Sequence, residues 1–294
     1  MNGIIVVDKP GDWTSHDVVA KLRGVLHEKR IGHGGTLDPM ATGVLPVFVG
    51  RATRAAEYCA SGEKEYVAGM TFGVTTDTQD TTGNVLTQTG LSPDLEALRG
   101  VLRSFAGTIS QIPPMYSAIK IGGKKLYQLA RRGVEVERAP RTVEIRELEL
   151  LETGESCCRI RVVCSKGTYI RTLCSDIGER LGCGAAMCSL VRTRAGTFEK
   201  SEAVSLDEVE NAVRAGMPEK VLRPVDSLFS GLPEVHLGEE QEKKCRNGNP
   251  FALPGADGQC RVYGPAGDFL MLGMRMDGTV RTVKSFFEPA KEDR

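Results

Sequence analysis

Strand-like and helix-like segments are mixed along this chain without regular alternation. Short apolar runs at residues 4–7 and 44–49 predict buried strands, and residues 64–72 alternate between apolar and polar side chains, as a half-buried strand does. Apolar residues recur at helical spacing over residues 15–26 and 170–181. A doubly wound parallel sheet needs strict strand–helix alternation, so we predict an α+β fold around a mixed, largely antiparallel sheet flanked by helices.

Residues that favour helix ends mark where helices start and stop. Further helices are expected over residues 92–105 and 126–132 and after residue 205, and residues 141–151 and 158–164 are expected to pair as strands. The end signals are Thr14 and Ser15 before the first helix, Ser92 and Pro93 at the start of the second, Gly133 and Gly182 at two C-termini, and a capping box from Ser205 to Glu208.

The pattern of apolar and turn-forming residues changes after residues 229–233. Short β-like runs at 259–263, 269–272 and 279–283 stand between Gly, Pro and Asp turns. We therefore predict a domain boundary near residue 231, which separates residues 1–231 from a small β-rich unit at residues 232–294. A unit of roughly sixty residues is near the practical lower size of a domain.

Charge is balanced overall but uneven along the chain. The 38 Lys and Arg residues equal the 38 Asp and Glu residues, which argues against a protein that coats nucleic acid through bulk charge. Between residues 120 and 146, however, cations outnumber carboxylates. A solvated surface and a nucleic-acid groove both explain this stretch, and the charges alone leave both open. The cations are Lys120, Lys124, Lys125, Arg131, Arg132, Arg138, Arg141 and Arg146, against Glu135, Glu137 and Glu144.

The cysteines and histidines predict no metal site. The nine cysteines form no Cys-x-x-Cys pair and only four histidines are present, so zinc-ligand spacing is missing. Cysteines in apolar runs, such as Cys164, are typical of buried free thiols and favour a reducing cytoplasm. The first eight residues lack the parts of a signal peptide, and no apolar window of about 18 residues is free of charge, so we expect neither a leader nor a membrane span.

The segment from Gly34 to Pro39 places an acid on a tight turn. Gly34 and Gly35 allow a sharp turn and close backbone approach, and Pro39 pushes Asp38 out of the helical region. Such a carboxylate can project from a loop at a fixed angle and serve catalysis. An Asp before Pro is equally a helix N-cap with Pro at the first helical position, and the six residues alone do not choose.

The fifteen residues from Gly32 to Pro46 resemble the catalytic-aspartate segment of the TruB family, which makes pseudouridine at uridine 55 of the tRNA T-loop. The resemblance implies that Asp38 is the catalytic residue. It also implies that His33, otherwise a polar loop residue, enters the RNA and helps to hold the uridine extruded.

An earlier segment, from Lys9 and Pro10 to Ser15, resembles the family's Lys-Pro segment, which supports the active-site loop. This chain has Asp12 where the family usually has Gly. Asp tolerates positive φ better than most residues, so we expect the turn to survive.

Three later segments extend the resemblance to active-site residues, and together with the thumb segment it runs from residue 9 to about 198. Tyr66 matches the family's active-site tyrosine, and the stretch from Lys166 to Arg171 implies that Tyr169 contacts the base and Arg171 pairs with Asp38. The Ser189–Thr193 stretch implies that Leu190 packs on the base. Taken alone, Tyr66 is a half-buried strand tyrosine, Arg171 a surface arginine and Leu190 a core leucine.

Residues 111–141 resemble the family's RNA-gripping thumb and coincide with the basic stretch described above. We expect this thumb to lack a core of its own, and to be mobile without RNA and ordered with it. The resemblance further implies a pseudouridine-synthase fold followed by a PUA-like RNA-binding module. The cations expected to contact RNA are Lys120, Lys124, Lys125, Arg131, Arg132 and Arg141.

The resulting hypothesis is a cofactor-independent RNA isomerase. No GxGxxG, P-loop or metal-ligand cluster is present, and the isomerisation needs no cofactor. The target uridine must leave its stack, and Asp38 must be ionised whether it attacks the sugar or base or removes a ribose proton. We expect tRNA, through its T-stem-loop, as the partner, and a cytoplasmic monomer with no membrane contact and no obligate protein partner. The alternatives are a catalytically silent RNA-binding or RNA-folding protein on the same scaffold, or a synthase with another RNA target.

Overall fold

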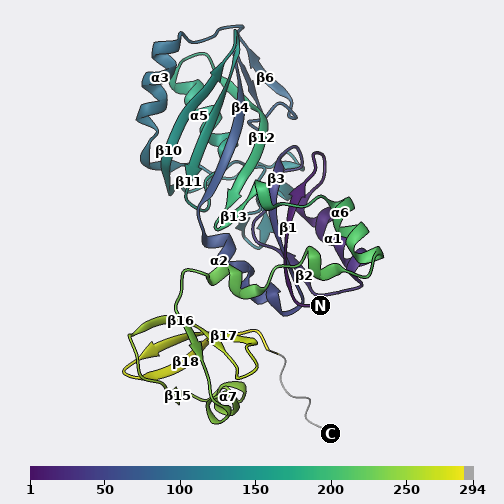
Figure 1. The fold of residues 1–294 in the computed structure, drawn as a ribbon. Coiled ribbons are helices and arrows are strands. Elements are labelled where there is room, and N and C mark those ends of the chain that lie inside the picture. The colour runs from purple at the N-terminus through teal and green to yellow at the C-terminus, as the bar shows by residue number, and fades with distance from the viewer. Residues whose placement is uncertain (288–294) are drawn as a thin grey trace.

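A nine-stranded sheet forms the larger part of the molecule, which the computed structural model describes over residues 1–287 (Figure 1). Seven strands follow the order β1-β3-β12-β4-β11-β10-β7, while β2 pairs with β3 and β13 with β12. Within these residues every pairing of this sheet is antiparallel except that of β3 with β12, so the predicted sheet type is confirmed. The strands are β1 Gly3–Lys9, β2 Ile31–His33, β3 Thr42–Val49, β4 Lys64–Phe72, β7 Gly107–Gln111, β10 Arg141–Thr153, β11 Cys157–Cys164, β12 Ala185–Ala195 and β13 Phe198–Glu199.

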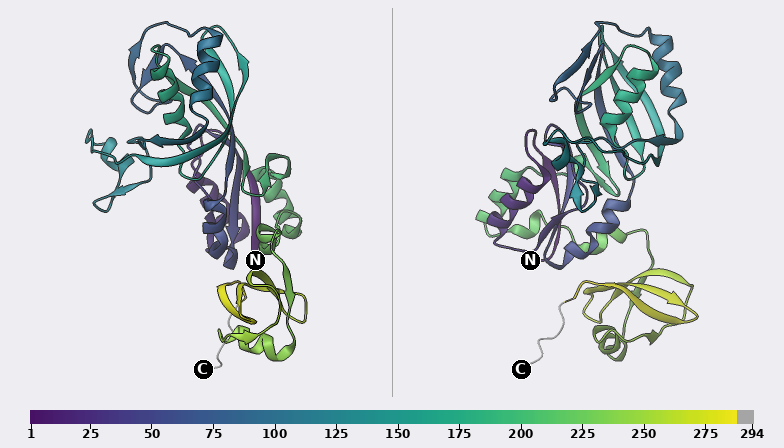
Figure 2. Two further views of the ribbon diagram at one scale, coloured as in Figure 1. Left: turned by 90° about the vertical axis from the view of Figure 1, so that its left-hand side faces the viewer. Right: turned by 180° about the vertical axis from the view of Figure 1, so that it is seen from behind.

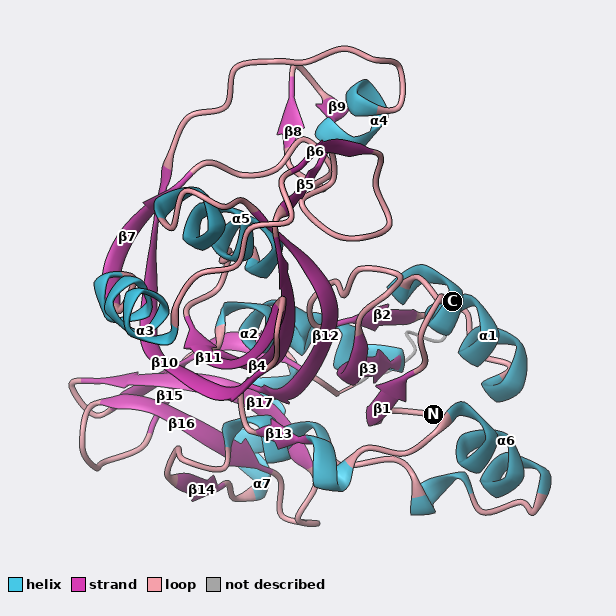
Figure 3. Cartoon of the chain, turned by 90° about the horizontal axis from the view of Figure 1, so that it is seen from above, coloured by secondary structure: helices cyan, strands magenta, loops and turns pink. Residues whose placement is uncertain are grey.

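Helices cover both halves of this sheet. Helices α3 and α5 lie side by side and pack on β4, β10 and β12, whereas α1 and α6 pack against β1 and β2 (Figures 1 and 3). Their apolar faces form one core cluster with the sheet, which includes Leu22 and Ile177. The helices are α1 Ser15–Leu26, α2 Ala56–Ser61, α3 Leu95–Ser104, α5 Ile170–Arg180 and α6 Leu206–Arg214, and the 3-10 helices are η1 Gly50–Ala55, η2 Lys200–Glu202, η3 Pro218–Lys220 and η4 Val225–Phe229.

Most of the predicted helix ends are confirmed. Thr14 caps α1 and Ser205 caps α6, each in a capping box, and Gly182 follows α5 with a φ of 73°. The predicted start of α3 at Ser92 and Pro93 is wrong. The helix starts at Leu95, because the Asp94 carboxylate accepts a hydrogen bond from the Ala97 N–H at 2.8 Å and acts as the cap.

The sheet narrows where its two halves meet. Strand β12 pairs with β4 along most of its length but with β3 at only two positions, Val191 with Thr42 and Arg192 with Gly43. Gly43 has a φ of 98°, and a Cβ there would lie 2.3 Å from the Arg192 carbonyl oxygen, so only glycine fits. The sequence patterns did not predict β12 as a strand, although it joins the two halves.

The thumb is a small excursion from the edge of the sheet. It comprises β8 Lys120–Ile121, β9 Lys124–Lys125 and α4 Leu126–Ala130, and it projects from the body as the teal segment at the left of Figure 2. Gly122 and Gly123 turn the hairpin with φ values of 57° and 80°. Within the thumb Leu126 is fully buried but belongs to none of the hydrophobic clusters of the described residues, and the expected lack of a core stays a prediction. A second hairpin, β5 Val74–Thr76 with β6 Val85–Gln88, lies beside the sheet.

A separate five-stranded sheet follows in the C-terminal part, in the order β14-β16-β17-β18-β15, and confirms the β-rich prediction. Its helix α7 was not predicted. Residues 288–294 of the predicted 232–294 unit lie outside the described residues, and the boundary at residue 231 stays a prediction. The elements are β14 Glu234–His236, α7 Glu239–Arg246, β15 Phe251–Ala252, β16 Gly258–Tyr263, β17 Phe269–Met276 and β18 Thr279–Ser285.

The two sheets are joined by apolar contact. Phe229, Leu272 and Phe286 belong to the same buried cluster as Ile4 and Phe48 of the large sheet. This packing fixes the small sheet against the end of the large one. In the part of the chain that the structure describes, no helix is long and apolar enough to cross a bilayer.

Candidate active site

A cavity of about 1050 Å³ opens where the two halves of the large sheet meet and where the thumb begins. Its wall combines the loop around Asp38, strand β4, residues 78–82, the thumb and the entry to α5. The predicted site residues that line it are Asp38, Tyr66, Lys125, Arg131, Tyr169 and Arg171. Segments far apart in the sequence therefore converge on one space.

Asp38 and Arg171 form a two-point ion pair in this cavity. The Arg171 Nε donates to Asp38 Oδ2 at 2.9 Å, and Nη2 donates to Oδ1 at 3.2 Å. The Arg171 side chain is only 5% exposed, whereas that of Asp38 is 35% exposed and open to the cavity. Such charge-assisted, two-point bonds fix the carboxylate in orientation. Residues 39–41 form a turn rather than a helix, so the interpretation of Asp38 as a helix N-cap is wrong.

The guanidinium of Arg171 is itself held on its other sides. Nη1 donates to the Thr78 carbonyl at 3.0 Å, and Nη2 donates to the Tyr116 carbonyl at 2.8 Å. A second carboxylate, Asp80, lies 3.7 Å from Nε and is buried. Its Oδ1 accepts from the Thr82 N–H at 3.0 Å. The sequence analysis missed Asp80; the available signal was the local Thr-x-Asp-x-Thr pattern, in which an Asp accepts from the residue two positions later.

Lys9 supports the Asp38 loop from inside the protein. It is fully buried, and its Nζ donates to the carbonyls of Trp13 at 2.5 Å and Pro39 at 3.1 Å. Burial lowers the pKa of Lys9 to about 8. Pro10 follows at the surface and gives Nζ a third carbonyl at 2.8 Å. Asp12 has a φ of 63°, which confirms that Asp accepts the turn conformation at the position where the family usually has Gly.

Arg192 performs a similar task from the other side. It is 1% exposed, and its guanidinium donates to the carbonyls of Val44 at 2.7 Å and Gly35 at 3.1 Å. The Asp38 loop is thus held by two buried cations through main-chain oxygens. Arg192 lies within the Ser189–Thr193 stretch, but no role was predicted for it, because burial of a charged side chain depends on packing that the local pattern does not contain.

Two tyrosines, Tyr66 and Tyr169, line the cavity. Tyr66 lies on β4, and Tyr169 immediately precedes α5. Burial raises the pKa of both phenols, so both are neutral near pH 7. The buried amide of Gln111 holds the Tyr169 backbone, with Oε1 accepting from its N–H at 2.8 Å and Nε2 donating to its carbonyl at 3.0 Å. The sequence analysis did not identify this role of Gln111.

Two predicted contacts lie outside the cavity wall. His33 ends β2 with its ring centroid 5.4 Å from that of His16, and it is His16 that lines the cavity. Burial and the neighbouring His16 lower the pKa of His33 to about 4, so the ring is neutral. Leu190 is 6% exposed and belongs to the main core cluster, where its side chain packs as a core leucine.

Of the six predicted thumb cations, Lys125 and Arg131 reach the cavity. Both lie over the ring of Tyr127, at 5.6 Å and 5.5 Å from its centroid. Nearby, the Ser117 hydroxyl lines the cavity and is buried without a hydrogen-bond partner among the described residues. The other four cations are exposed and lie away from the wall: Lys120, Lys124, Arg132 and Arg141.

The arrangement offers a fixed carboxylate, a buried cation beside it and two neutral phenols. Residues 1–287 contain no group of three or more His, Cys, Asp or Glu side chains that could hold a metal ion. The chemistry that these side chains can provide is nucleophilic attack or proton removal by a carboxylate that faces the cavity.

Comparisons with known proteins show the family to which the chain belongs. Residues 23–170 match the family described as TruB family pseudouridylate synthase (N-terminal domain), and residues 171–230 match the tRNA pseudouridylate synthase B C-terminal domain. A tRNA pseudouridine synthase B from Bacillus licheniformis is 44% identical over 262 residues, covering 87% of this chain and 85% of the relative. One from Clostridium kluyveri is 40% identical over 294 residues, covering 97% of this chain and all of the relative.

A solved structure of an H/ACA RNP bound to a substrate RNA containing 2′-deoxyuridine contains a chain with the same fold. That chain is 26% identical, with a TM-score of 0.74, and the match covers 98% of this chain and 86% of that one. The large sheet, the cavity with Asp38 and Arg171, and the matches over most of the sequence lead to one assignment. The chain belongs to the TruB family of pseudouridylate synthases, which are isomerases.

Proposed function

We propose that this enzyme converts uridine 55 in the T-loop of tRNA to pseudouridine, with Asp38 as the catalytic carboxylate. The observation that carries the proposal is the two-point pairing of the accessible Asp38 with the buried Arg171 inside a cavity. The names of the bacterial relatives, which are tRNA pseudouridine synthases, support tRNA as the substrate.

The reaction breaks the C1′–N1 bond, turns the uracil and forms a C1′–C5 bond, and the proton on C5 is replaced by one on N1. Atoms and electrons balance within the substrate, so the protein needs to supply only a base or nucleophile and a binding site. Asp38 supplies it by attack on the sugar or base or by removal of a ribose proton. Arg171, through its two hydrogen bonds, holds the carboxylate in a fixed orientation toward the substrate in either route.

The target nucleotide must leave its stack to react, at a cost of a few kcal/mol. A cavity of about 1050 Å³ accepts a flipped nucleotide together with part of its loop, since small-molecule sites measure roughly 300–1,000 Å³. Tyr66 and Tyr169 offer aromatic faces for the free uracil. We keep His33 as the residue that fills the vacated space in the RNA and Leu190 as support under the base, although neither lines the cavity of the free protein.

The thumb is proposed to grip the T-stem-loop through phosphate contacts and to become ordered on binding. Its exposed cations Lys124 and Arg132 support this role. We also propose that the protein acts as a monomer in the cytoplasm without an obligate protein partner, and that the chain divides near residue 231. All nine cysteines are free thiols, which supports a reducing compartment.

The test is to map pseudouridine in an unmodified tRNA transcript after incubation with the purified enzyme and no added cofactor. We expect one pseudouridine, at position 55, and none in a transcript that carries cytidine there. Conversion at another position would assign a different RNA target. Binding without any conversion would contradict the proposal.

A further inference from the structure

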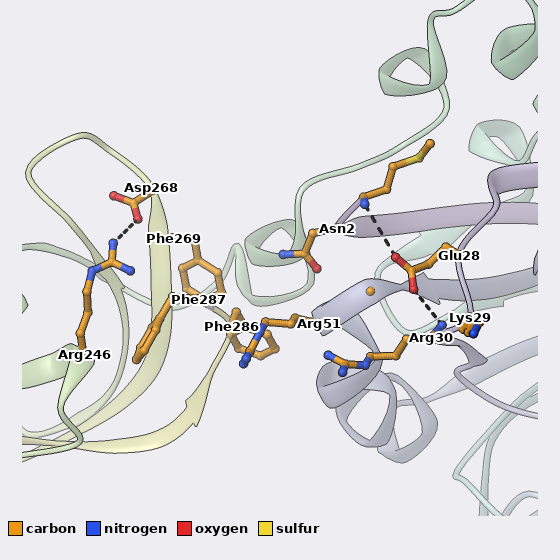
Figure 4. Close-up of a pocket in the computed structure, with 12 residues that line it drawn as sticks. Asn2, Glu28, Lys29, Arg30, Arg51, Arg246, Asp268, Phe269, Phe286 and Phe287 are labelled. Carbon is orange, nitrogen blue, oxygen red and sulfur yellow. Dashed lines mark hydrogen bonds and ion pairs between the residues drawn. The ribbon is translucent and has the colours of Figure 1, made fainter. Parts of the chain in front are cut away.

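A second cavity, of about 610 Å³, lies between the end of the large sheet and the C-terminal sheet (Figure 4). It shares no lining residue with the active-site cavity. Arg30, just before β2, and Arg51, in η1, line it on the side of the large sheet. Phe269 in β17 and Phe287, which follows β18, line it on the side of the small sheet. The apolar packing that joins the two sheets fixes both walls.

This cavity carries positive charge that the described residues do not neutralise. Of its two carboxylates, Asp268 pairs with Arg246 at 2.9 Å, and Glu28 accepts the Arg30 backbone N–H at 2.9 Å. Within residues 1–287, no carboxylate lies within 4.0 Å of the side-chain nitrogens of Lys29, Arg30 or Arg51. Figure 4 shows the guanidinium ends of Arg30 and Arg51 turned toward the C-terminal sheet.

One of these donors is buried and unsatisfied. The Nε of Arg51 has no hydrogen-bond partner among the described residues, although the atom is inaccessible to solvent. A buried charged donor without an acceptor costs more than an exposed one. A bound anion would supply the missing acceptor and would also accept hydrogen bonds from Arg30.

The backbone holds the two arginines in place. The Gly50 N–H donates to the Arg30 carbonyl at 2.7 Å, which ties the two loops together next to Arg51. Gly50 has a φ of 64°, and a Cβ there would lie 2.2 Å from the Met1 carbonyl oxygen. The Ala52 N–H donates to Asn2 Oδ1 at 2.8 Å. The cationic wall is therefore part of the folded scaffold.

The opposite wall is aromatic. Phe286 is buried and stacks on Phe269 with ring centroids 5.2 Å apart, and both Phe269 and Phe287 are partly exposed. Arg246 lies 5.3 Å from the centroid of the Phe287 ring. Flat apolar rings beside unpaired guanidinium groups match a nucleotide, whose base stacks on an aromatic ring while its phosphate accepts hydrogen bonds from arginine. A metal cation is repelled by this wall.

The two cavities lie at opposite ends of β3. The Asp38 loop leads into Thr42 at the start of the strand, and Val49 at its end is followed directly by Gly50 and Arg51. Eight residues of strand span roughly 26 Å. That is less than one turn of a nucleic-acid duplex, about 35 Å, so one folded RNA can reach both cavities.

We propose that this second cavity binds a nucleotide of the substrate RNA outside the T-stem-loop, with its phosphate on Arg30 and Arg51 and its base on Phe287. The inference rests on the proposed function, since it takes tRNA as the substrate. The proposed contact lies at the junction of the two sheets, and an isolated T-stem-loop hairpin cannot make it.

The test compares an Arg30→Gln/Arg51→Gln double variant with the wild type. Dissociation constants are measured at several salt concentrations for full-length unmodified tRNA and for the isolated T-stem-loop. We expect full-length tRNA to bind about tenfold more weakly, with the slope of log K against log salt reduced by about two. Binding and conversion of the hairpin stay within about twofold of the wild type, because the hairpin ends before this cavity.

The matched control is Arg103→Gln/Lys220→Gln, which removes two exposed cations that have no carboxylate within 4.0 Å among residues 1–287. This control should leave both RNAs unaffected. A Phe287→Leu variant should weaken full-length tRNA about threefold, as expected for loss of one stacked base. Unchanged affinity in that variant would contradict the base contact.

Unchanged tRNA affinity in the double variant, or an equal loss for tRNA and hairpin, would overturn the proposal. A third result would also overturn the proposal: inorganic phosphate protects the wild type, but not the double variant, against heat, while both bind tRNA equally. The cavity would then be a site for free phosphate. Failure of the proposed function looks different, because wild-type enzyme would then convert neither RNA.

Discussion

The Asp38 loop and the thumb use the same kind of side chain in opposite ways. Around the loop, Lys9 and Arg192 are buried and donate to main-chain carbonyls, and Arg171 is buried and paired with Asp38. In the thumb, Lys124 and Arg132 are exposed, with no carboxylate within 4.0 Å among residues 1–287. Burial therefore separates cations that hold protein geometry from cations available to RNA.

The difference has measurable consequences. A buried cation that satisfies several carbonyls acts on stability and on the turnover of bound substrate, because its loss leaves buried acceptors unpaired and shifts the reacting group. An exposed cation that meets a phosphate acts on affinity and its salt dependence. Variants of buried cations should therefore change stability and kcat, whereas variants of exposed cations should change RNA affinity and its salt dependence.

The largest effect is expected from Arg171→Gln. Loss of the charged partner of Asp38 should lower kcat about 100- to 1000-fold, the range for removal of one preorganised electrostatic contact, while KM for tRNA stays within about threefold. Steady-state kinetics on tRNA measure both. Arg159→Gln, which removes an exposed pair with Glu152, is the matched control and should change neither. A rise in KM with unchanged kcat would place Arg171 with the RNA-binding cations.

Arg192→Met should destabilise the protein. The carbonyls of Gly35 and Val44 would lose their partner, and we expect a loss of about 3 kcal/mol in the free energy of unfolding. Urea unfolding measures it. Arg132→Met in the thumb should change stability by less than about 0.5 kcal/mol. Equal losses in the two variants would break the distinction between buried and exposed cations.

The buried Lys9 should make the stability of the protein depend on pH. Its pKa is about 8 in the folded protein, against an ordinary value of 10.5, so between these values the unfolded chain binds more protons. The burial penalty of Lys9 is complete below pH 8 and is relieved as pH rises toward 10.5. The stability of the wild type relative to Lys9→Met should therefore rise by roughly 1–3 kcal/mol over this range. A pH-independent difference in urea unfolding would show that Lys9 is not a charged buried group.

Several features of the site were predictable from the sequence, and the reason differs from feature to feature. Local patterns predicted α1, α6 and the strand pair β10–β11, because caps and alternation are short-range signals. The resemblance predicted that Arg171 would face Asp38, across 133 residues of chain. Asp80, Gln111 and Arg192 were missed, since a polar side chain becomes buried only through partners distant in sequence. For Leu190 the local pattern was sufficient, because the residue taken alone predicts a core leucine and its side chain packs in the main core cluster.

The smallest effect is expected in the thumb. Lys124→Gln/Arg132→Gln should raise the dissociation constant of tRNA by roughly three- to tenfold and reduce the salt slope by about two, with kcat unchanged. Filter binding across salt concentrations measures it. Glu135→Gln, which removes a thumb carboxylate paired with Arg138, is the control and should not weaken binding. A fall in kcat at saturating tRNA would show that these cations also position the reacting nucleotide.

The central claim is that Asp38 performs the chemistry while other residues hold it in place or bind RNA. The most direct measurement is single-turnover conversion of tRNA by saturating enzyme, for the wild type and for Asp38→Asn, with tRNA affinity measured in parallel. We predict that Asp38→Asn binds tRNA within about threefold of the wild type and forms no detectable pseudouridine. Conversion by Asp38→Asn at a rate near that of the wild type would contradict the account.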